Sequence, residues 1–171
     1  MKKVICLVVF MSLFLSGCST AAWETVEDGD AAVSALGQID TYAIELDVVK
    51  DMTLVVEDEY GSVYSTQHGE MEVETRTFVA SSPETAVAML SGLSADTMTI
   101  LQTGRFGLPE YQFVWVSHTE QGSRLNRADL LMDGVQCYAV ICSTSEQAGN
   151  SYDEQLRHVF ATFTLETEET V

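Results

Sequence analysis

The stretch Tyr111–Cys142 (YQFVWVSHTEQGSRLNRADLLMDGVQCYAVIC) contains three strand patterns separated by two short turn patterns. The turns are centred on Glu120–Ser123 and on Asp133-Gly134, a dipeptide typical of tight hairpins. Strands joined this closely must be antiparallel, because a parallel pair needs a crossover of about a dozen residues. The stretch therefore predicts an antiparallel sheet. Its last strand, Val135–Cys142, is apolar at nearly every position, which indicates burial on both faces.

Four further strand patterns precede this stretch, at Tyr42–Val48, Thr53–Val56, Ser62–Gln67 and Met71–Ala80. A fifth strand pattern, at Thr97–Thr103, lies between these four and the opening stretch. Two helices are predicted between and after the strands. The first follows Ser82-Pro83, a capping hydroxyl and a first-turn proline, and has the apolar stripe Ala86, Met89, Leu90 and Leu93. The second follows a capping-box pattern, Ser151 to Glu154, and has the stripe Leu156, Val159, Phe160 and Phe163.

This order of elements predicts the α+β class, an antiparallel β-sheet flanked by helices. The two helices are expected to cover the faces of the sheet, which would bury the strongly apolar segment Gln112–Val116.

Residues 42–165 resemble the PsbP-like fold. The resemblance is carried by the Pro83–Leu93 helix, the Tyr111–His118 and Leu125–Met132 strand pair, the Gly134–Val140 strand and the closing Tyr152–Phe163 helix. It implies an α/β/α sandwich around an antiparallel sheet, in a fold that hosts partner-binding and assembly roles. The matching residues are packing patterns, so no binding residue of the family is carried over.

The N-terminus has the pattern of a cleaved export signal. Two lysines precede the apolar run Val4–Leu15, which as a helix spans only about 18 Å, too short to cross a bilayer. Leu15-Ser16-Gly17-Cys18 resembles the lipobox of bacterial lipoproteins. The resemblance implies that Cys18 is acylated and begins the mature protein; the alternative is an ordinary cleavage site that happens to precede a cysteine.

Four regions follow: a signal (1–17), an acidic tether (18–40), one α+β domain (41–165) and an acidic tail (166–171). Trp23 and Val26 are apolar residues of the tether that could dock on the domain. Ala31–Ile39 is ambiguous between a short helix and further linker. The expected location is extracytoplasmic, with the protein held by lipid on the bacterial cell membrane. The sequence does not distinguish an inner from an outer membrane.

The predicted mature chain is strongly acidic. The signal contains two of the eight basic residues and none of the 26 acidic ones, so the remainder has six against 26, a formal charge of −20. Such a charge repels nucleic acid and anionic headgroups, and a tight partner would need cationic character. The simpler interpretation is a surface that keeps an exported domain soluble.

Cys137 and Cys142 are the two cysteines expected in the folded domain. Their odd separation on one strand places them on opposite faces, with Cα atoms about 16 Å apart. A disulfide requires less than about 7 Å. We therefore expect two free thiols that act as small hydrophobic side chains, and a redox or metal role would require them to be close together.

No catalytic, metal or cofactor motif stands out. His68, His118 and His158 lack a metal-ligand spacing, and the sequence has neither Gly-x-Ser-x-Gly nor Ser-x-x-Lys. Glu57–Glu59 lacks the alternating oxygens of a calcium loop and is interpreted as a solvated turn. We expect no cofactor and no enzyme activity, although paired carboxylates for hydrolysis are invisible in a sequence with this many acids.

One segment suggests recognition. Glycines bound a predicted loop at Gly104–Pro109 that would expose Arg105 and Phe106 between two core strands, and such loops often carry binding residues. Arg124 lies on the nearby strand and could add to a positive patch. Against this, Arg127 and Arg124 are three apart and face opposite sides of the strand, and Phe106 could fold back onto the sheet.

The sequence thus supports a lipid-anchored binding or assembly module that contacts the membrane through its lipid and binds a protein partner. The alternative is a lipoprotein that binds a small ligand or cation for a membrane system. A hydrolase is the third hypothesis. Oligomeric state is not indicated.

Overall fold

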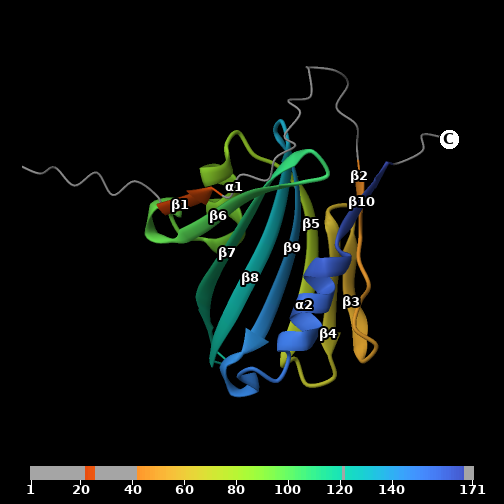
Figure 1. Ribbon diagram of the computed structural model, residues 1–171. Helices are drawn as coiled ribbons and strands as arrows, with labels where there is room; N and C mark the ends of the chain where they lie inside the picture. Colours follow the sequence, from red (N-terminus) through yellow and green to blue (C-terminus); the bar gives the residue numbers. More distant parts are fainter. Residues whose placement is uncertain (1–21, 26–41, 121, 168–171) are drawn as a thin grey trace, which may run out of the picture.

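The computed structural model describes residues 22–25, 42–120 and 122–167 (Figure 1). Its strands are β1 (Ala22–Thr25), β2 (Tyr42–Glu45), β3 (Met52–Asp58), β4 (Gly61–Thr66), β5 (Met71–Val79), β6 (Thr99–Arg105), β7 (Leu108–Thr119), β8 (Gly122–Asp133), β9 (Gln136–Ser145) and β10 (Thr164–Thr167). Its α-helices are α1 (Pro83–Ser91) and α2 (Asp153–Thr162), and two 3-10 turns are η1 (Ala95–Thr97) and η2 (Glu146–Ala148).

Eight strands form one sheet in the order β1-β6-β7-β8-β9-β5-β4-β3, and β10 pairs with β2 in a separate two-stranded sheet. Every pairing in the large sheet is antiparallel except that of β1 with β6, which is parallel. The predicted α+β class with an antiparallel sheet flanked by helices is confirmed.

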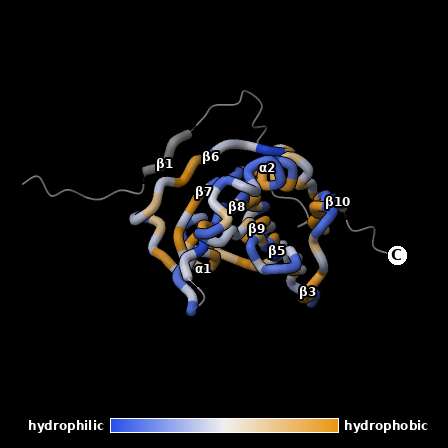
Figure 2. The backbone as a smooth tube through the Cα atoms, turned by 90° about the horizontal axis from the view of Figure 1, so that it is seen from below, coloured by the Kyte–Doolittle hydropathy of each residue, from blue (hydrophilic) through white to orange (hydrophobic). Residues whose placement is uncertain are grey.

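The two helices lie on opposite sides of the large sheet (Figure 2). One core cluster joins α1 to the sheet through Ala86, Val87, Phe113 and Leu130. The second joins α2 to the other face through Leu156, Val159 and Phe163, and the β2–β10 sheet packs against the same cluster. The arrangement is the α/β/α sandwich that the sequence resemblance implies.

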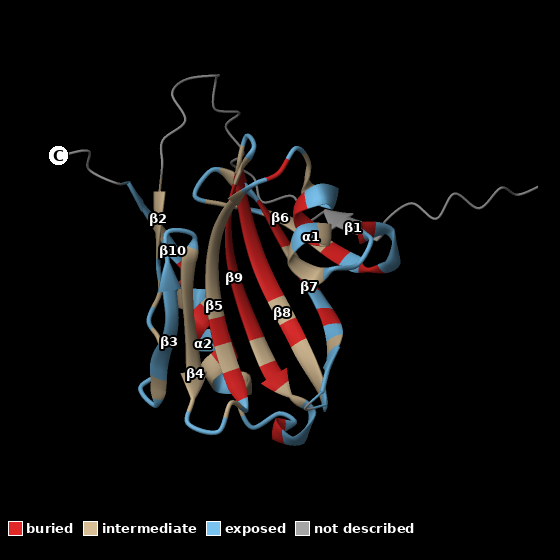
Figure 3. Cartoon of the chain, turned by 180° about the vertical axis from the view of Figure 1, so that it is seen from behind, coloured by how far each residue is buried: buried red, intermediate tan, exposed pale blue. Residues whose placement is uncertain are grey.

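Strand β9 lies at the centre of the molecule and is buried along most of its length (Figure 3). Its alternating side chains divide between the two cores, with Cys137 in the α1 cluster and Cys142 in the α2 cluster. Both thiols are free and buried, so the prediction of opposite faces is confirmed. Burial raises the pKa of Cys137 to about 11 and that of Cys142 to about 12, which keeps both thiols protonated.

Helix α1 begins as predicted and packs Ala86 and Leu90 of the expected stripe against the core, but the rest of that stripe is not buried. Ser82 accepts a hydrogen bond from the amide of Thr85, Pro83 occupies the first turn, and Gly92 ends the helix in the left-handed region. Ala86 and Val87 are buried, whereas Met89 and Leu93 of the expected stripe are exposed. The helix sits over only one corner of the sheet, so its second apolar edge has no neighbour to cover it.

Helix α2 buries the predicted apolar residues but lacks the predicted capping box. It begins at Asp153, one residue after Tyr152, and no side chain caps its first amides. The carboxylate of Asp153 instead lies 3.4 Å from the guanidinium of Arg127 on β8. The expectation that Ser151 caps the helix is therefore wrong, and the helix starts one residue later than a Ser151 cap would place it.

The ends of the predicted domain also differ. Ala22–Thr25, expected to be tether, forms β1 at the edge of the large sheet, with Ala22 opposite Thr99. Glu166, expected to begin a frayed tail, pairs with Ala43 in β10. Both segments use the unsatisfied backbone of a neighbouring edge, which a composition-based boundary does not detect. Val26 and Ala31–Ile39 lie outside the described residues.

Smaller shifts occur at turns. The β8–β9 turn consists of Gly134 and Val135, one residue later than expected, so Val135 is exposed rather than part of the buried strand. Thr97 belongs to η1, and β6 starts at Thr99.

Within the described residues, no helix has the length and apolar character needed to cross a membrane.

The difference between the two helix starts is testable by urea denaturation. Ser82→Ala should lower the free energy of unfolding by about 1 kcal/mol, because it removes the hydroxyl that accepts from Thr85. Ser151→Ala should change it by less than about 0.5 kcal/mol, because the structure gives α2 no side-chain cap. Equal losses in the two variants would contradict the assigned start of α2.

Candidate functional site

The segment Gly104–Pro109 is a tight hairpin rather than an exposed loop. Arg105 and Leu108 are the last paired residues of β6 and β7, and only Phe106 and Gly107 form the turn. Both turn residues have positive φ, 56° and 77°, the pattern of a type I′ hairpin turn. A bulky residue is uncommon at such a φ, so Phe106 occupies a strained position.

The side chain of Arg105 is engaged inside the protein. Its Nε is 2.8 Å from Glu110 Oε1, and its Nη2 is 3.2 Å from Asp129 Oδ2. Both carboxylates are almost fully covered, that of Asp129 being 2% exposed. The expectation that Arg105 presents its charge to a partner is therefore not met, because two acids brought from β7 and β8 surround the guanidinium.

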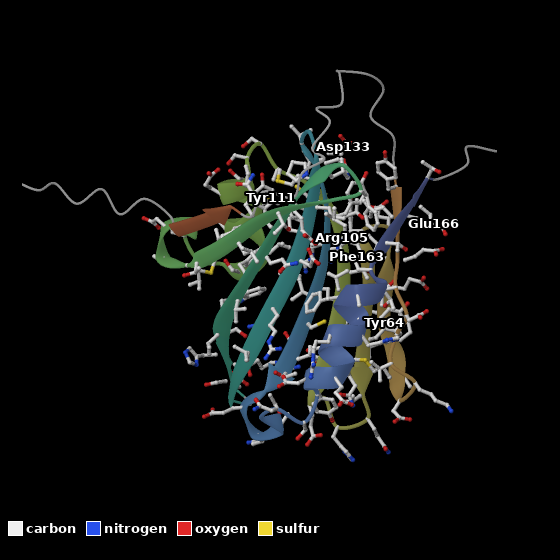
Figure 4. The ribbon with its side chains drawn as sticks, viewed as in Figure 1. Tyr64, Arg105, Tyr111, Asp133, Phe163 and Glu166 are labelled. Atoms are coloured by element: carbon white, nitrogen blue, oxygen red, sulfur yellow. The ribbon has the colours of Figure 1, made fainter. Side chains whose placement is uncertain are left out.

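Arg105 also joins the hairpin to the end of α2. Its Nη1 donates to the carbonyl oxygens of Phe160 and Phe163, at 3.1 and 3.4 Å. Figure 4 shows Arg105 beside Phe163, and the guanidinium carbon lies 5.7 Å from the centre of that ring. A cation at a helix C-terminus satisfies carbonyls that have no partner within the helix and interacts favourably with the helix dipole.

The other two expected recognition residues lie apart from each other. Phe106 is 58% exposed at the hairpin tip, with its ring centre 6.0 Å from the Arg105 guanidinium. Arg124 is on the face of the sheet opposite to Arg105, where it pairs with Glu72 at 3.1 Å and donates to the carbonyl of Gly69. No single patch unites the three residues, and a recognition role for Phe106 stays a prediction.

The Glu110–Asp129 carboxylate pair has unusual electrostatics. Burial and then the nearby Glu110 carboxylate raise the pKa of Asp129, Arg105 opposes the shift, and the resulting pKa is about 8. The hydroxyl of Thr103 donates to Glu110. One arginine thus faces two acids, and Asp129 holds a proton at neutral pH. The pair is covered by the hairpin and by α2, so its evident role is to hold these elements together.

The histidines do not assemble a site. His118 contacts the hydroxyl of Ser123, and His158 lies 3.9 Å from Asp47 in an exposed contact. Among the described residues, no group of three or more His, Cys, Asp or Glu side chains is arranged to hold a metal ion.

The most distinct surface feature follows from a mismatch between strands. β6 pairs with β7 only as far as Ile100 opposite Phe113. The next residues of β7, Val114–His118, pair with β8, and no other described strand pairs with them. Helix α2 lies over the opposite half of this face and leaves β7 uncovered (Figure 1). A hollow of about 680 Å³ lies along the unpaired edge of β7, beside the start of β6.

The wall of the hollow on the α2 side is mostly aliphatic. Val114 and Val116 are 51% and 49% exposed, although the sequence predicts that the helices cover this strand. The register places Leu101 beside Gln112 and Val114 beside Arg127 on the same face, because paired residues of neighbouring strands point the same way. Phe160 of α2 completes the wall. We call these residues, Leu101, Gln112, Val114, Val116, Arg127 and Phe160, the β7 wall.

Sequence reasoning missed the β7 wall for a physical reason. An exposed valine on a strand has the same pattern as a buried one, and the sequence patterns predicted strands of similar length at 97–103 and 111–118. The structure extends β7 to twelve residues against seven in β6. The part of β7 that β6 does not cover becomes visible from the pairing register.

No protein-family model and no curated protein matches the sequence. Among solved structures, a protein from Bacteroides thetaiotaomicron is similar at 11% identity with a TM-score of 0.50, covering 73% of this chain; this chain spans 46% of that protein. LpqN, involved in cell envelope biogenesis of Mycobacterium tuberculosis, is similar at 10% identity and TM-score 0.48, covering 76% and 87% of the two chains. Cyanobacterial PsbP from Synechocystis is similar at 9% identity and TM-score 0.46, covering 78% and 99%. At sequence identities this low, the similarity is a similarity of fold alone.

Two hairpin substitutions should have opposite effects on stability. Arg105→Gln should lower the free energy of unfolding by about 3 kcal/mol or more, because it leaves the Glu110 carboxylate buried without a cation and removes donors to Asp129 and α2. Phe106→Asn should raise it by up to about 1 kcal/mol, because Asn-Gly suits this turn. Urea denaturation at pH 7 measures both. A near-neutral Arg105→Gln would contradict the engaged position of this arginine.

The raised pKa of Asp129 predicts a pH dependence. Between the pKa of the unfolded state, about 3.9, and the folded value of about 8, the folded protein holds a proton that the unfolded chain does not. This group's contribution to stability is therefore fully present below pH 4 and is lost as the pH rises through 8. Asp129→Asn should remove that loss, so the melting temperature of the variant should rise relative to wild type between pH 6 and 9.

Asp133→Asn, on the same strand at the turn, is the matched control and should follow wild type across this range. A parallel pH profile for Asp129→Asn and wild type would show that Asp129 is ionised in the folded protein.

Proposed function

We propose that this chain is an exported lipoprotein, acylated on Cys18, that acts as a binding module without chemistry of its own. The support for the anchor is the charged start, the short apolar run and the Leu15–Cys18 pattern. The support for binding is one observation: a hollow of about 680 Å³ whose wall exposes aliphatic side chains beside an unpaired strand edge. This volume lies within the usual range of ligand sites.

The chemistry of the hollow favours binding over catalysis. Its lining contains threonines, one glutamine and Arg127 as polar groups, together with the covered, protonated Asp129. A hydroxyl or thiol nucleophile for acyl transfer needs a neighbouring base, and the lining holds no histidine, serine or cysteine to form such a pair. Glycoside hydrolysis needs two carboxyl groups, and the lining holds one, Asp129. The buried carboxylate pair lies beneath the hairpin, with Glu110 only 4% exposed.

A second candidate occupant is a protein segment. Strand edges with unpaired backbone groups accept an added strand, and Val114 and Val116 alternate on one face as side-chain contacts for such a strand. This mode would make the protein an assembly factor. The observation that favours it is the edge of β7 from Val114 to His118, which no other described strand covers.

The anchor and the site can be tested in the same cells. Cys18→Ala should abolish incorporation of labelled fatty acid and release the protein from the membrane fraction. A photo-crosslinking amino acid at position 114 of the anchored protein should form a specific adduct on irradiation, whether with a protein or a small molecule. The same residue at position 135 is the matched control, because Val135 is 46% exposed at the β8–β9 turn.

Retained labelling of Cys18→Ala would sink the lipoprotein assignment. Equal or absent adducts at positions 114 and 135 would show that the hollow is not a binding site.

A further inference from the structure

The hollow lies close to the proposed anchor, and this inference rests on the proposed function. Ala22, the first residue of β1, is opposite Thr99 of β6, and Thr99 lines the hollow. Neighbouring strands are about 4.8 Å apart. Cys18 precedes Ala22 by four residues, which span at most about 14 Å. An acyl group on Cys18 therefore holds the rim of the hollow within roughly 20 Å of the membrane surface.

The β7 wall has the composition of an acyl-chain site. Leu101, Val114 and Val116 provide an aliphatic surface, and Phe160 stands beside it on α2. Met98 and Trp115 line the hollow from the other side of the strand. Apolar side chains with few fixed polar groups are typical of sites for apolar ligands. A small polar solute or a cation would find few partners on this wall.

One cation, Arg127, lies beside this apolar surface on the neighbouring strand. Arg127 lies beside Val114, and its side chain is 34% exposed. Its contact with Asp153 is long, 3.4 Å from Nη2 to Oδ1, compared with 2.8 Å for the shorter ion pair of Arg105. A guanidinium held by a long, half-exposed ion pair can bind a carboxylate or phosphate through its remaining donors. The strong negative charge of the chain as a whole makes this local cation the more distinctive.

We infer that the hollow binds the hydrocarbon chain of a single-chain anionic lipid taken from the membrane to which the protein is anchored. The chain lies on Leu101, Val114, Val116 and Phe160, and the head group binds Arg127. The bound hydrocarbon chain covers two exposed valines and so removes them from water. The head group gains a charge-assisted hydrogen bond. No covalent step is involved.

The test uses the mature polypeptide, residues 18–171 with Cys18→Ser, so that no acyl group of its own competes. The probe is cis-parinaric acid, whose fluorescence rises when it leaves water. One saturable site with a Kd on the order of 10–100 µM is expected from the ligand efficiency of a molecule this size. Val116→Asp should weaken binding by at least about tenfold, because it places a charge on the apolar wall. Val135→Asp, an equally exposed valine at the distant turn, should have no effect.

Arg127→Gln separates the head-group contact from the apolar one. It should weaken parinaric acid about tenfold but leave the methyl ester of the same acid unchanged, because the ester has no charge to lose. Circular dichroism of each variant checks that the fold is kept. Non-saturable binding, or equal binding by Val116→Asp and Val135→Asp, overturns the inference.

The outcomes separate this inference from the function it rests on. A protein adduct at position 114 together with no parinaric acid binding would overturn the lipid site and leave a protein-binding module. Loss of both the adduct and the probe would remove the binding function itself.

Discussion

The ion pairs of Arg105 are the contact on which most of the architecture depends. One guanidinium binds a carboxylate from β7, a carboxylate from β8 and two carbonyls at the end of α2. Without this cation, the Glu110 carboxylate would be buried beside Asp129 and near the negative end of a helix dipole with no positive charge to offset it, which is unfavourable. Because the hairpin, the sheet and the end of α2 meet at this residue, Arg105 holds the end of α2 in place, and the apolar core under the helix holds the rest of it. The position of α2 determines which half of the face stays open.

Local signals in the sequence were sufficient for much of the fold. Ser82 and Pro83 mark the start of α1 through contacts within one turn, and the alternation along β9 places Cys137 and Cys142 on opposite faces. These features depend on neighbours in the chain or on the two-residue period of a strand. The resemblance of the sequence to the PsbP-like fold correctly predicts the layered arrangement. It offered no information about which strand edges are covered.

The wrong predictions about the site concern contacts between strands, whereas shifts such as that of the β8–β9 turn are local. Arg105 is occupied because Glu110 and Asp129 converge on it from two other strands. The open β7 wall arises because the pairing of β6 with β7 stops at Ile100, opposite Phe113, while β7 continues beyond this residue. A glycine-bounded segment was a reasonable signal for an exposed arginine, yet the hairpin that it forms turns this side chain inward. The register between strands determines which charged residues pair across a sheet, and this register cannot be predicted from a single sequence.

The parallel pairing of β1 limits how far the sheet can lie from Cys18. With β1 in the sheet, the connection from Cys18 to Ala22 is at most about 14 Å long. If β1 separated from β6, the next described strand would begin at Tyr42, and the connection could reach roughly 80 Å. Among the described residues, a ladder of four residues holds the short connection. Under the acylation proposed for Cys18, the pairing of β1 would keep the domain close to the membrane, and its release would let the domain extend farther away.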